Sequence, residues 1–343
     1  MRHKILPILL ACMILYCLAF PQRMAESVAG GLLLWYRSIL PTLLPFCIFS
    51  SVIVRSGIYD RFFERLYPVF RVLYPVRSPL IYPLVAGFLF GFPLGSKICA
   101  DLYHAGKISS DEAEAVSCIS NQFGPAFLCN YLYRNLFQNE LPAFAVLAAC
   151  YLPPLLLGRI RLHRLYRRSG STGLHHLYHE HSNSSAGLHR LYHGHNSINN
   201  RDNFPTGETK KPTPESPLNI KILDAGISDS FTTMIMLAGY IILSALLADI
   251  ILQIPLNNPL IKSLCIGIME ITNGLSRIRM LTAKTAIKSM LAIGIVNLGG
   301  ISGLCQTWSV MKGTGFHIHR YLVFRMLCSL IGMLLIRCAL KLC

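Results

Sequence analysis

The chain has 343 residues, of which 53% are hydrophobic and 14% charged, and its mean hydropathy is +0.47. This composition excludes an ordinary soluble protein and predicts an all-α, polytopic integral membrane protein. The formal net charge of +16 would suggest a nucleic-acid binder in a soluble chain. Here the basic residues lie mainly in loops and at helix ends, as cytoplasmic retention requires, so we expect a lipid bilayer and no nucleic acid as partner.

The first elements in chain order are membrane helices. Residues 5–20 form a short apolar run behind a basic N-terminus, which predicts an uncleaved first helix that starts in the cytoplasm. A second span is expected at 32–54. Residues 55–77 carry five arginines among aromatic and aliphatic residues, a pattern typical of an amphipathic helix on the cytoplasmic surface.

An interrupted segment follows. Residues 79–105 are apolar up to Gly95 and polar beyond it, which favours a re-entrant hairpin over a complete span. Ser109 is placed to cap a helix that breaks at Gly124-Pro125 and continues to about residue 137. Residues 141–158 then cross back and end in a cluster of arginines, which places that end in the cytoplasm.

From about residue 161 to 220 the composition changes to His, Ser, Asn, Gly and Pro, with near-repeats of the form Leu-His-Arg-Leu-Tyr. This predicts a disordered cytoplasmic linker that grew by local duplication. Eight of the twelve histidines fall in it. Either they bind a metal or they follow from repeat expansion; no carboxylate or thiolate completes a defined shell, and we expect no metal and no cofactor.

The second half of the chain resumes the membrane pattern. It predicts a span at 230–252, a hairpin at 259–280, an interrupted helix at 282–313 and a last span at 317–340. The expected organisation is therefore an N-terminal helix with its connection, a first membrane repeat, the linker and a second membrane repeat, with boundaries at 1–31, 32–160, 161–220 and 221–343.

Two short motifs recur in the same order in the two halves. Ser96-Lys97 matches Ser276-Arg277, and Asn121-x-x-Gly124 matches Asn297-x-x-Gly300, at separations of 25 and 21 residues. Paired interruptions of hydrophobic segments indicate an internal duplication. Counting spans from a cytoplasmic N-terminus gives the halves opposite orientations. The predicted architecture is an inverted repeat with two re-entrant hairpins and two interrupted helices.

One observation disagrees with that orientation. Arg277, Arg279, Lys284 and Lys288 would lie on or near the outer side, although basic residues usually stay on the cytoplasmic side. Residues in a cavity lined by protein are exempt from this rule, so the inverted model is kept.

Five segments carry a resemblance to a known family: Gly91-Phe-Pro-Leu-Gly-Ser-Lys97, Ile108-Ser-Ser-Asp-Glu-Ala-Glu114, Asn121-Gln-Phe-Gly-Pro125, Glu270-Ile-Thr-Asn-Gly274 and Gly299-Gly-Ile-Ser302. They resemble the sporulation integral membrane protein family known as YlbJ. That family carries the nucleoside recognition, or Gate, domain and is similar in architecture to concentrative nucleoside transporters. The resemblance covers about 5–160 and 220–340. It implies export of dipicolinate from the mother cell across the outer forespore membrane during sporulation.

The two matched cations suggest a solute site. A charge at the bilayer centre costs about 3 kcal/mol or more unless it is paired or hydrated. An anionic solute with two carboxylates would compensate Lys97 and Arg277, aided by helix N-termini after Gly124 and Gly300. Alternatively, both cations extend to an interface.

Polar residues at the breaks extend this candidate site. Glu270 is expected to carry a coupling proton, to bind a cation or to pair with Arg277. Asn121, Asn273 and Asn297 either bind a planar polar solute or cap broken helix ends. The full candidate set is Gly91, Pro93, Gly95, Ser96, Lys97, Asn121, Gln122, Gly124, Pro125, Glu270, Thr272, Asn273, Gly274, Ser276, Arg277, Asn297, Gly299, Gly300, Ser302 and Gln306.

The sequence thus favours a multi-pass secondary transporter of a small anionic or heteroaromatic solute, in the cell membrane or the outer forespore membrane. Two alternatives stay open: transport of nucleoside-like solutes, and a non-transporting scaffold required for spore maturation. No catalytic motif and no nucleotide-binding loop lies in the chain, so we expect neither an enzyme nor an ATP-driven pump. The coupling ion stays open, and a homo-oligomer is a further possible partner state.

Overall fold

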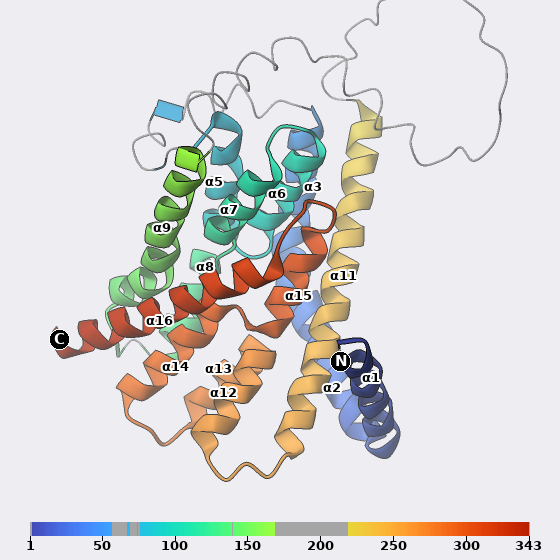
Figure 1. The fold of residues 1–343 in the computed structure, drawn as a ribbon. Helices are drawn as coiled ribbons and strands as arrows, with labels where there is room; N and C mark the ends of the chain where they lie inside the picture. The colour runs from blue at the N-terminus through green and yellow to red at the C-terminus, as the bar shows by residue number, and fades with distance from the viewer. Residues whose placement is uncertain are drawn as a thin grey trace, which may run out of the picture.

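The expected all-α membrane fold is confirmed by the computed structural model (Figure 1), which describes residues 2–56, 67–68, 74, 76–138, 140–168 and 219–342. Four of its helical stretches are long and apolar enough to cross a membrane, and a fifth span arises if one bent pair counts as a single span. Most of the expected surface helix at 55–77, and the linker from residue 169, lie outside the described residues.

The N-terminal helices form a pair beside one long helix. Helix α1 is followed directly by α2, which passes through a π-helical turn into α3, with a bend of 51° between the two. Residues 21–31, expected as a connection, are instead helical: Pro21 starts α2, and the helix continues through Gly30 and Gly31. Both α2 and α3 pack on α11. The bounds are α1 Arg2–Ala19, α2 Pro21–Leu34, the π turn Trp35–Ile39, α3 Leu40–Ser56 and α11 Ile220–Gln253.

Two helical hairpins lie where the sequence predicts them. In the first, α5 and α6 are joined by a bend at 91–93 (the first bend); in the second, α12 and α13 are joined at Glu270 (the second bend). Each arm has 10 or 11 residues and is therefore about 16 Å long, half of a hydrocarbon core of about 30 Å. No single arm crosses a membrane. The bounds are α5 Ile81–Phe90, α6 Leu94–His104, α12 Pro259–Met269 and α13 Ile271–Met280.

Two interrupted helices follow the hairpins. Helix α7 ends before 121–124 (the first break), after which α8 continues as a π-helix; α14 ends at Gly299 (the second break) and α15 resumes at once. The backbone of Gly299 is left-handed, with φ +86°, which favours glycine. The expected cap of α7 forms as a capping box between Ser109 and Glu112. The bounds are α7 Ser110–Ser120, α8 Pro125–Phe127, the π-helix Leu128–Leu136, α14 Thr285–Leu298 and α15 Gly300–Val310.

Each bend packs against the break of its own half. A Cβ atom added to Gly91 would lie 2.5 Å from the backbone nitrogen of Gly124, so the first bend touches the first break. A Cβ atom added to Gly300 would lie 3.1 Å from the side chain of Ile271, so the second bend touches the second break. Both halves therefore place one hairpin bend on one interrupted helix.

Three long helices complete the fold: α9 Ala143–Arg168, α11 and α16 Ile318–Leu342. Helix α9 runs past the expected linker boundary at 161, and α11 begins ten residues before the expected span. Helix α9 continues past residue 161 because its last turns are amphipathic. Leu162 is fully buried, and Leu165 and Tyr166 pack on the same core.

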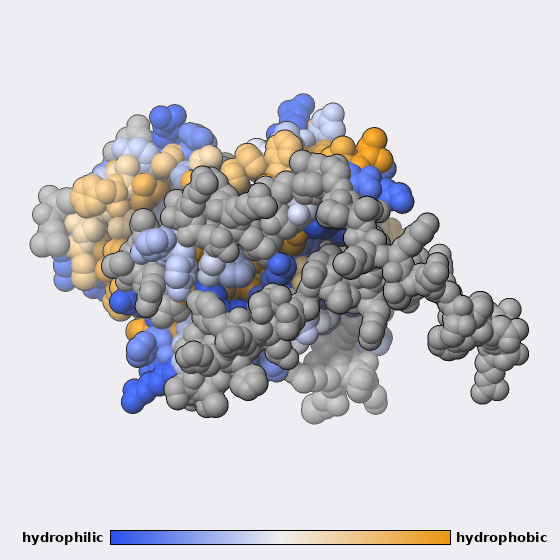
Figure 2. All heavy atoms as spheres, turned by 90° about the horizontal axis from the view of Figure 1, so that it is seen from above, coloured by the Kyte–Doolittle hydropathy of each residue, from blue (hydrophilic) through white to orange (hydrophobic). Residues whose placement is uncertain are grey.

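The two hairpins lie toward opposite ends of the molecule (Figure 1). The end of α9 and the start of α11 share one end; α5 and α6 lie toward it, and α12 and α13 toward the other. Figure 2 looks onto the first end and shows clusters of hydrophilic residues there. The last turns of α9, at the same end, carry the basic residues Arg159, Arg164 and Arg167, a pattern typical of the cytoplasmic side of a membrane. This arrangement is the one expected of an inverted repeat.

The orientation predicts a labelling pattern. In a cysteine-free background, Glu140→Cys and Leu256→Cys should react with a membrane-impermeant maleimide from outside the cell, because turns 138–142 and 253–258 are expected there. Arg167→Cys should react only after the membrane is permeabilised. If both outer positions react only after permeabilisation, the inverted orientation is wrong.

Candidate functional site

A buried asparagine ends the first part of each interrupted helix. Asn121 donates from Nδ2 to the hydroxyls of Thr307 at 2.8 Å and Tyr321 at 2.7 Å. Asn297 donates from Nδ2 to the carbonyl oxygen of Ala149 at 3.0 Å. Both side chains are 1% exposed. Each asparagine thus bonds to helices of the other half, α15 and α16 in one case and α9 in the other.

Arg325, from the first half of α16, lies between the two breaks. Its Nη1 donates to the Gln122 side-chain oxygen at 2.7 Å and to the Asn121 carbonyl at 3.4 Å, while Nη2 donates to the Val296 carbonyl at 3.3 Å. The guanidinium therefore bonds at the C-terminal ends of α7 and α14. Sequence reasoning missed Arg325, although it is the arginine farthest from the ends of the expected span at 317–340, and a charge inside an apolar span is a signal of function.

A polar chain continues from the second break into α15. Ser302 accepts hydrogen bonds from Ser244 of α11 and from Gln306, both at 2.9 Å. Beside it, Gly303 leaves room for Phe92 of the first bend, whose ring would be 3.5 Å from an added Cβ atom. The first bend thus contacts the second interrupted helix as well as its own.

An aromatic series leads from the first bend toward the second hairpin. The ring centroids are 5.9 Å apart for Phe92 and Phe123, 4.7 Å for Phe123 and Phe127, and 5.1 Å for Phe127 and Tyr131. The Tyr131 hydroxyl lies 3.0 Å from Ser276 Oγ and donates to the Thr272 carbonyl at 3.1 Å. These partly buried rings form a continuous aromatic series between the two hairpins, in which Phe123, Phe127 and Tyr131 stack and Phe92 is tilted against Phe123.

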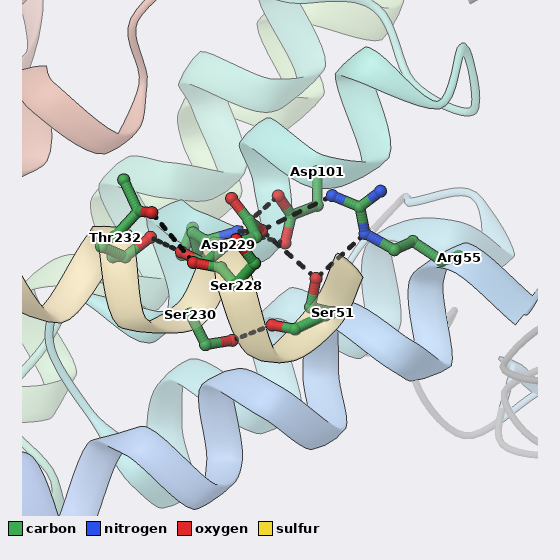
Figure 3. Close-up of polar contacts among 10 residues, drawn as sticks. Ser51, Arg55, Asp101, Ser228, Asp229, Ser230 and Thr232 are labelled. Carbon is green, nitrogen blue, oxygen red and sulfur yellow. Dashed lines mark hydrogen bonds and ion pairs between the residues drawn. The ribbon is translucent and has the colours of Figure 1, made fainter. Parts of the chain in front are cut away.

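Lys97 is neutralised by carboxylates of the protein itself. Its Nζ donates to both oxygens of Asp101, at 2.7 and 2.9 Å, and to Asp229 of α11 at 2.7 Å. Figure 3 shows Asp101, Asp229, Ser51 and Arg55 pointing toward one another from α6, α11 and α3. Ser51 donates to Asp229 at 3.2 Å, and Arg55 lies 3.8 Å from it. All three ammonium donors are in use, so Lys97 is bound to aspartates rather than placed to receive a solute.

Arg277 and Glu270 do not pair with each other. Glu270 caps α13, accepting from the backbone nitrogens of Thr272 at 3.1 Å and Asn273 at 2.7 Å and from the Thr272 hydroxyl at 2.6 Å. Arg277 is partly exposed, and within the described ranges it forms no ion pair. The two matched cations therefore have different surroundings.

The candidate residues divide by exposure. Those at the bends and breaks are mostly buried, and Ser96 in addition lies 2.6 Å from Ser117 Oγ. The exposed and partly exposed ones lie at Gly124-Pro125, in α13 and at Gly299. Two surface cavities in the described part of the chain, one lined by residues 257–260 and 281–283 and the other by residues 22, 23, 26, 27 and 249, contain no candidate residue. The buried set is Gly91, Pro93, Gly95, Ser96, Lys97, Asn121, Gln122, Glu270, Gly274, Asn297, Gly300, Ser302 and Gln306; the more exposed set is Gly124, Pro125, Thr272, Asn273, Ser276, Arg277 and Gly299.

Two buried carboxylates at the start of α7 hold it to neighbouring segments. Glu112 accepts from Arg77 Nε at 2.7 Å and from the Tyr166 hydroxyl at 2.8 Å. Burial acts to raise the pKa of Glu112, but the hydrogen bonds and charge of Arg77 lower it overall. Glu114 pairs with Arg161 of α9 and with His317, whose Nδ1 is 2.9 Å away. These contacts fix α7 between the two halves.

These features, with several apolar helices around a buried polar interior, define a multi-pass α-helical membrane protein. No protein-family model and no solved structure matches the chain.

The chain is 25% identical to the sporulation integral membrane protein YlbJ of Bacillus subtilis (strain 168), across 94% of this chain and 80% of that protein. This similarity supports its membership of the YlbJ family of sporulation integral membrane proteins, the family that the sequence motifs resemble.

Proposed function

We propose that this protein is a secondary transporter of a small anionic solute, with dipicolinate as the first candidate. On this proposal it acts in sporulation, as the name of its relative suggests, and exports the solute across the outer forespore membrane. The solute crosses between the two hairpins. The proposal requires no enzyme activity and no nucleic-acid partner.

The observation that carries the proposal is the matched pair of bends and breaks. Each break frees backbone N–H and C=O groups inside an apolar fold, and such groups are tolerated at membrane depth only where protein or a watery cavity satisfies them. A scaffold needs neither the breaks nor the buried amides of Asn121, Gln122 and Asn297. A transporter needs both, because movement of a bend off its break opens a path to polar groups in the interior.

Charge favours an anion over a neutral nucleoside. The buried part of the site contains the cation Arg325, and within the described residues no carboxylate pairs with it. The carboxylate of Glu270, by contrast, is taken up by the N-terminus of α13. The aromatic series at the first bend suits a flat ring, which both dipicolinate and a nucleoside offer.

A binding measurement on purified protein tests the proposal. Isothermal titration with dipicolinate and with uridine should show binding of the first and little binding of the second, and proteoliposomes should take up radiolabelled dipicolinate. Preference for uridine would favour the nucleoside alternative. Binding without any uptake, under imposed proton or sodium gradients of either direction, would favour the scaffold.

A further inference from the structure

Arg325 presents one edge of its guanidinium group that the protein leaves largely unused. We propose that this edge, formed by Nε and Nη2, binds a carboxylate of the solute at the second break. The inference rests on the proposed transport function and gives its site a position and a ligand class. It moves the anion site away from Lys97 and Arg277, the cations that the sequence motifs indicate.

The hydrogen bonds of Arg325 are unevenly distributed. Nη1 carries the short bond to Gln122 and a second bond to the Asn121 carbonyl. Nη2 has a single long bond of 3.3 Å to Val296, and Nε is buried with no partner. A buried donor left unpaired costs the loss of its hydration, and that cost is larger in a charged group. The Nε–Nη2 edge is the fork that binds a carboxylate through two parallel hydrogen bonds.

The space beside the Cα atom of Gly299, which a side chain would fill in any other residue, lies next to this edge. A Cβ atom added there would lie 3.5 Å from Nη2 and 3.7 Å from Nε of Arg325. Gly299 is also the N-cap of α15, and its glycine offers no side chain to the free backbone N–H groups of the first turn. A carboxylate beside Gly299 would meet both the guanidinium and the positive end of α15.

Within the described residues, no carboxylate of the protein occupies the position proposed for the solute carboxylate beside Arg325. In the described parts of the chain Arg325 has no carboxylate partner, and its other acceptors are the helix-end carbonyls and one amide. The side chain is 1% exposed, so the site is closed in this conformation. A solute reaches it when Ile271, directly after the second bend, moves away from Gly300.

Conservative substitution separates this role from a purely structural one. Arg325→Lys keeps a cation that can still donate to Gln122 and the Asn121 carbonyl, but it removes the two-pronged edge. We expect the folded Arg325→Lys protein to bind dipicolinate and isophthalate at least about tenfold more weakly than the natural chain. Binding of the uncharged analogue pyridine-2,6-dicarboxamide should be weak and unchanged. Arg337→Lys, an exposed substitution on the same helix, is the matched control.

Isothermal titration of the purified full chain, with thermal unfolding as a measure of folding, gives the outcomes. Unchanged affinity for both dicarboxylates in folded Arg325→Lys overturns the inference and leaves Arg325 as a clamp on two helix ends. So does an equal loss in Arg337→Lys, or the absence of dicarboxylate binding to the natural chain. Weaker binding in Arg325→Lys, in a natural chain that binds but does not transport, supports the inference and overturns the transport function.

Discussion

Gly87→Ala is expected to disrupt the packing of the first hairpin. An added Cβ atom would overlap the Ser120 carbonyl oxygen and lie 2.7 Å from Ser120 Cβ and 2.8 Å from its carbonyl carbon. Gly95, on the other arm, meets the same residue, with its added Cβ 2.5 Å from the Ser120 carbonyl oxygen. Both arms of the hairpin therefore contact the backbone of the last turn of α7 directly. Because the nearest atoms belong to the backbone, no side-chain rotation relieves the clash. The free energy of unfolding should fall by about 3 kcal/mol.

Thermal unfolding of the purified protein in detergent measures the effect, and the chain provides a matched control. Gly239 lies in α11 and has no atom within 4 Å of an added Cβ. Gly239→Ala should stabilise slightly, by about 0.5–1 kcal/mol, because alanine favours the helix. Equal stability of the two variants would show that the hairpin does not pack on α7 as described.

Lys97→Ala is expected to destabilise the fold strongly rather than to weaken solute binding alone. The Lys97 side chain is 6% exposed, and its removal leaves the carboxylates of Asp101 and Asp229 near each other without their shared cation. Removing one partner of a buried ion pair costs about 3–5 kcal/mol. Since Asp229 is 34% exposed and has Arg55 nearby, we expect the lower end, about 3 kcal/mol.

Charge-neutral variants show whether the loss is electrostatic. Lys97→Met combined with Asp101→Asn and Asp229→Asn should recover most of the thermal stability, because no unpaired charge remains. Arg277→Ala, at the matched position of the second half, should change the free energy of unfolding by less than about 0.5 kcal/mol. A stable Lys97→Ala protein that has lost only dipicolinate binding would return the anion site to the first hairpin.

The hairpins and breaks were predictable because their signals are local. Glycine and proline interrupt apolar runs at Gly91, Pro93, Gly124 and Gly299, and lipid leaves few alternatives for such segments. The matched dipeptides then indicated that the pattern occurs twice. The end of α9 at Arg168 and the start of α11 at Ile220 were harder to predict, because the amphipathic ends of these helices resemble the polar linker in composition.

The electrostatic partners were not predictable in the same way. Lys97 meets Asp229, 132 positions further along the chain, and Arg325 meets Gln122, 203 positions back. A motif shows which charge lies in the membrane, but it does not show which distant segment compensates it. The sequence therefore identified Lys97 as a charge that needs compensation and assigned it to a solute, whereas the fold provides two aspartates.

The crossed bonds of Asn121 and Asn297 bear on how such a chain arises. Each half of the chain supplies the acceptors for an asparagine of the other half, so either half alone would leave a buried amide unpaired. An ancestral single-repeat protein would have needed a second copy inserted upside down. Arg168 and Ile220 share one end of the molecule, as the joining of two antiparallel copies into one chain would require.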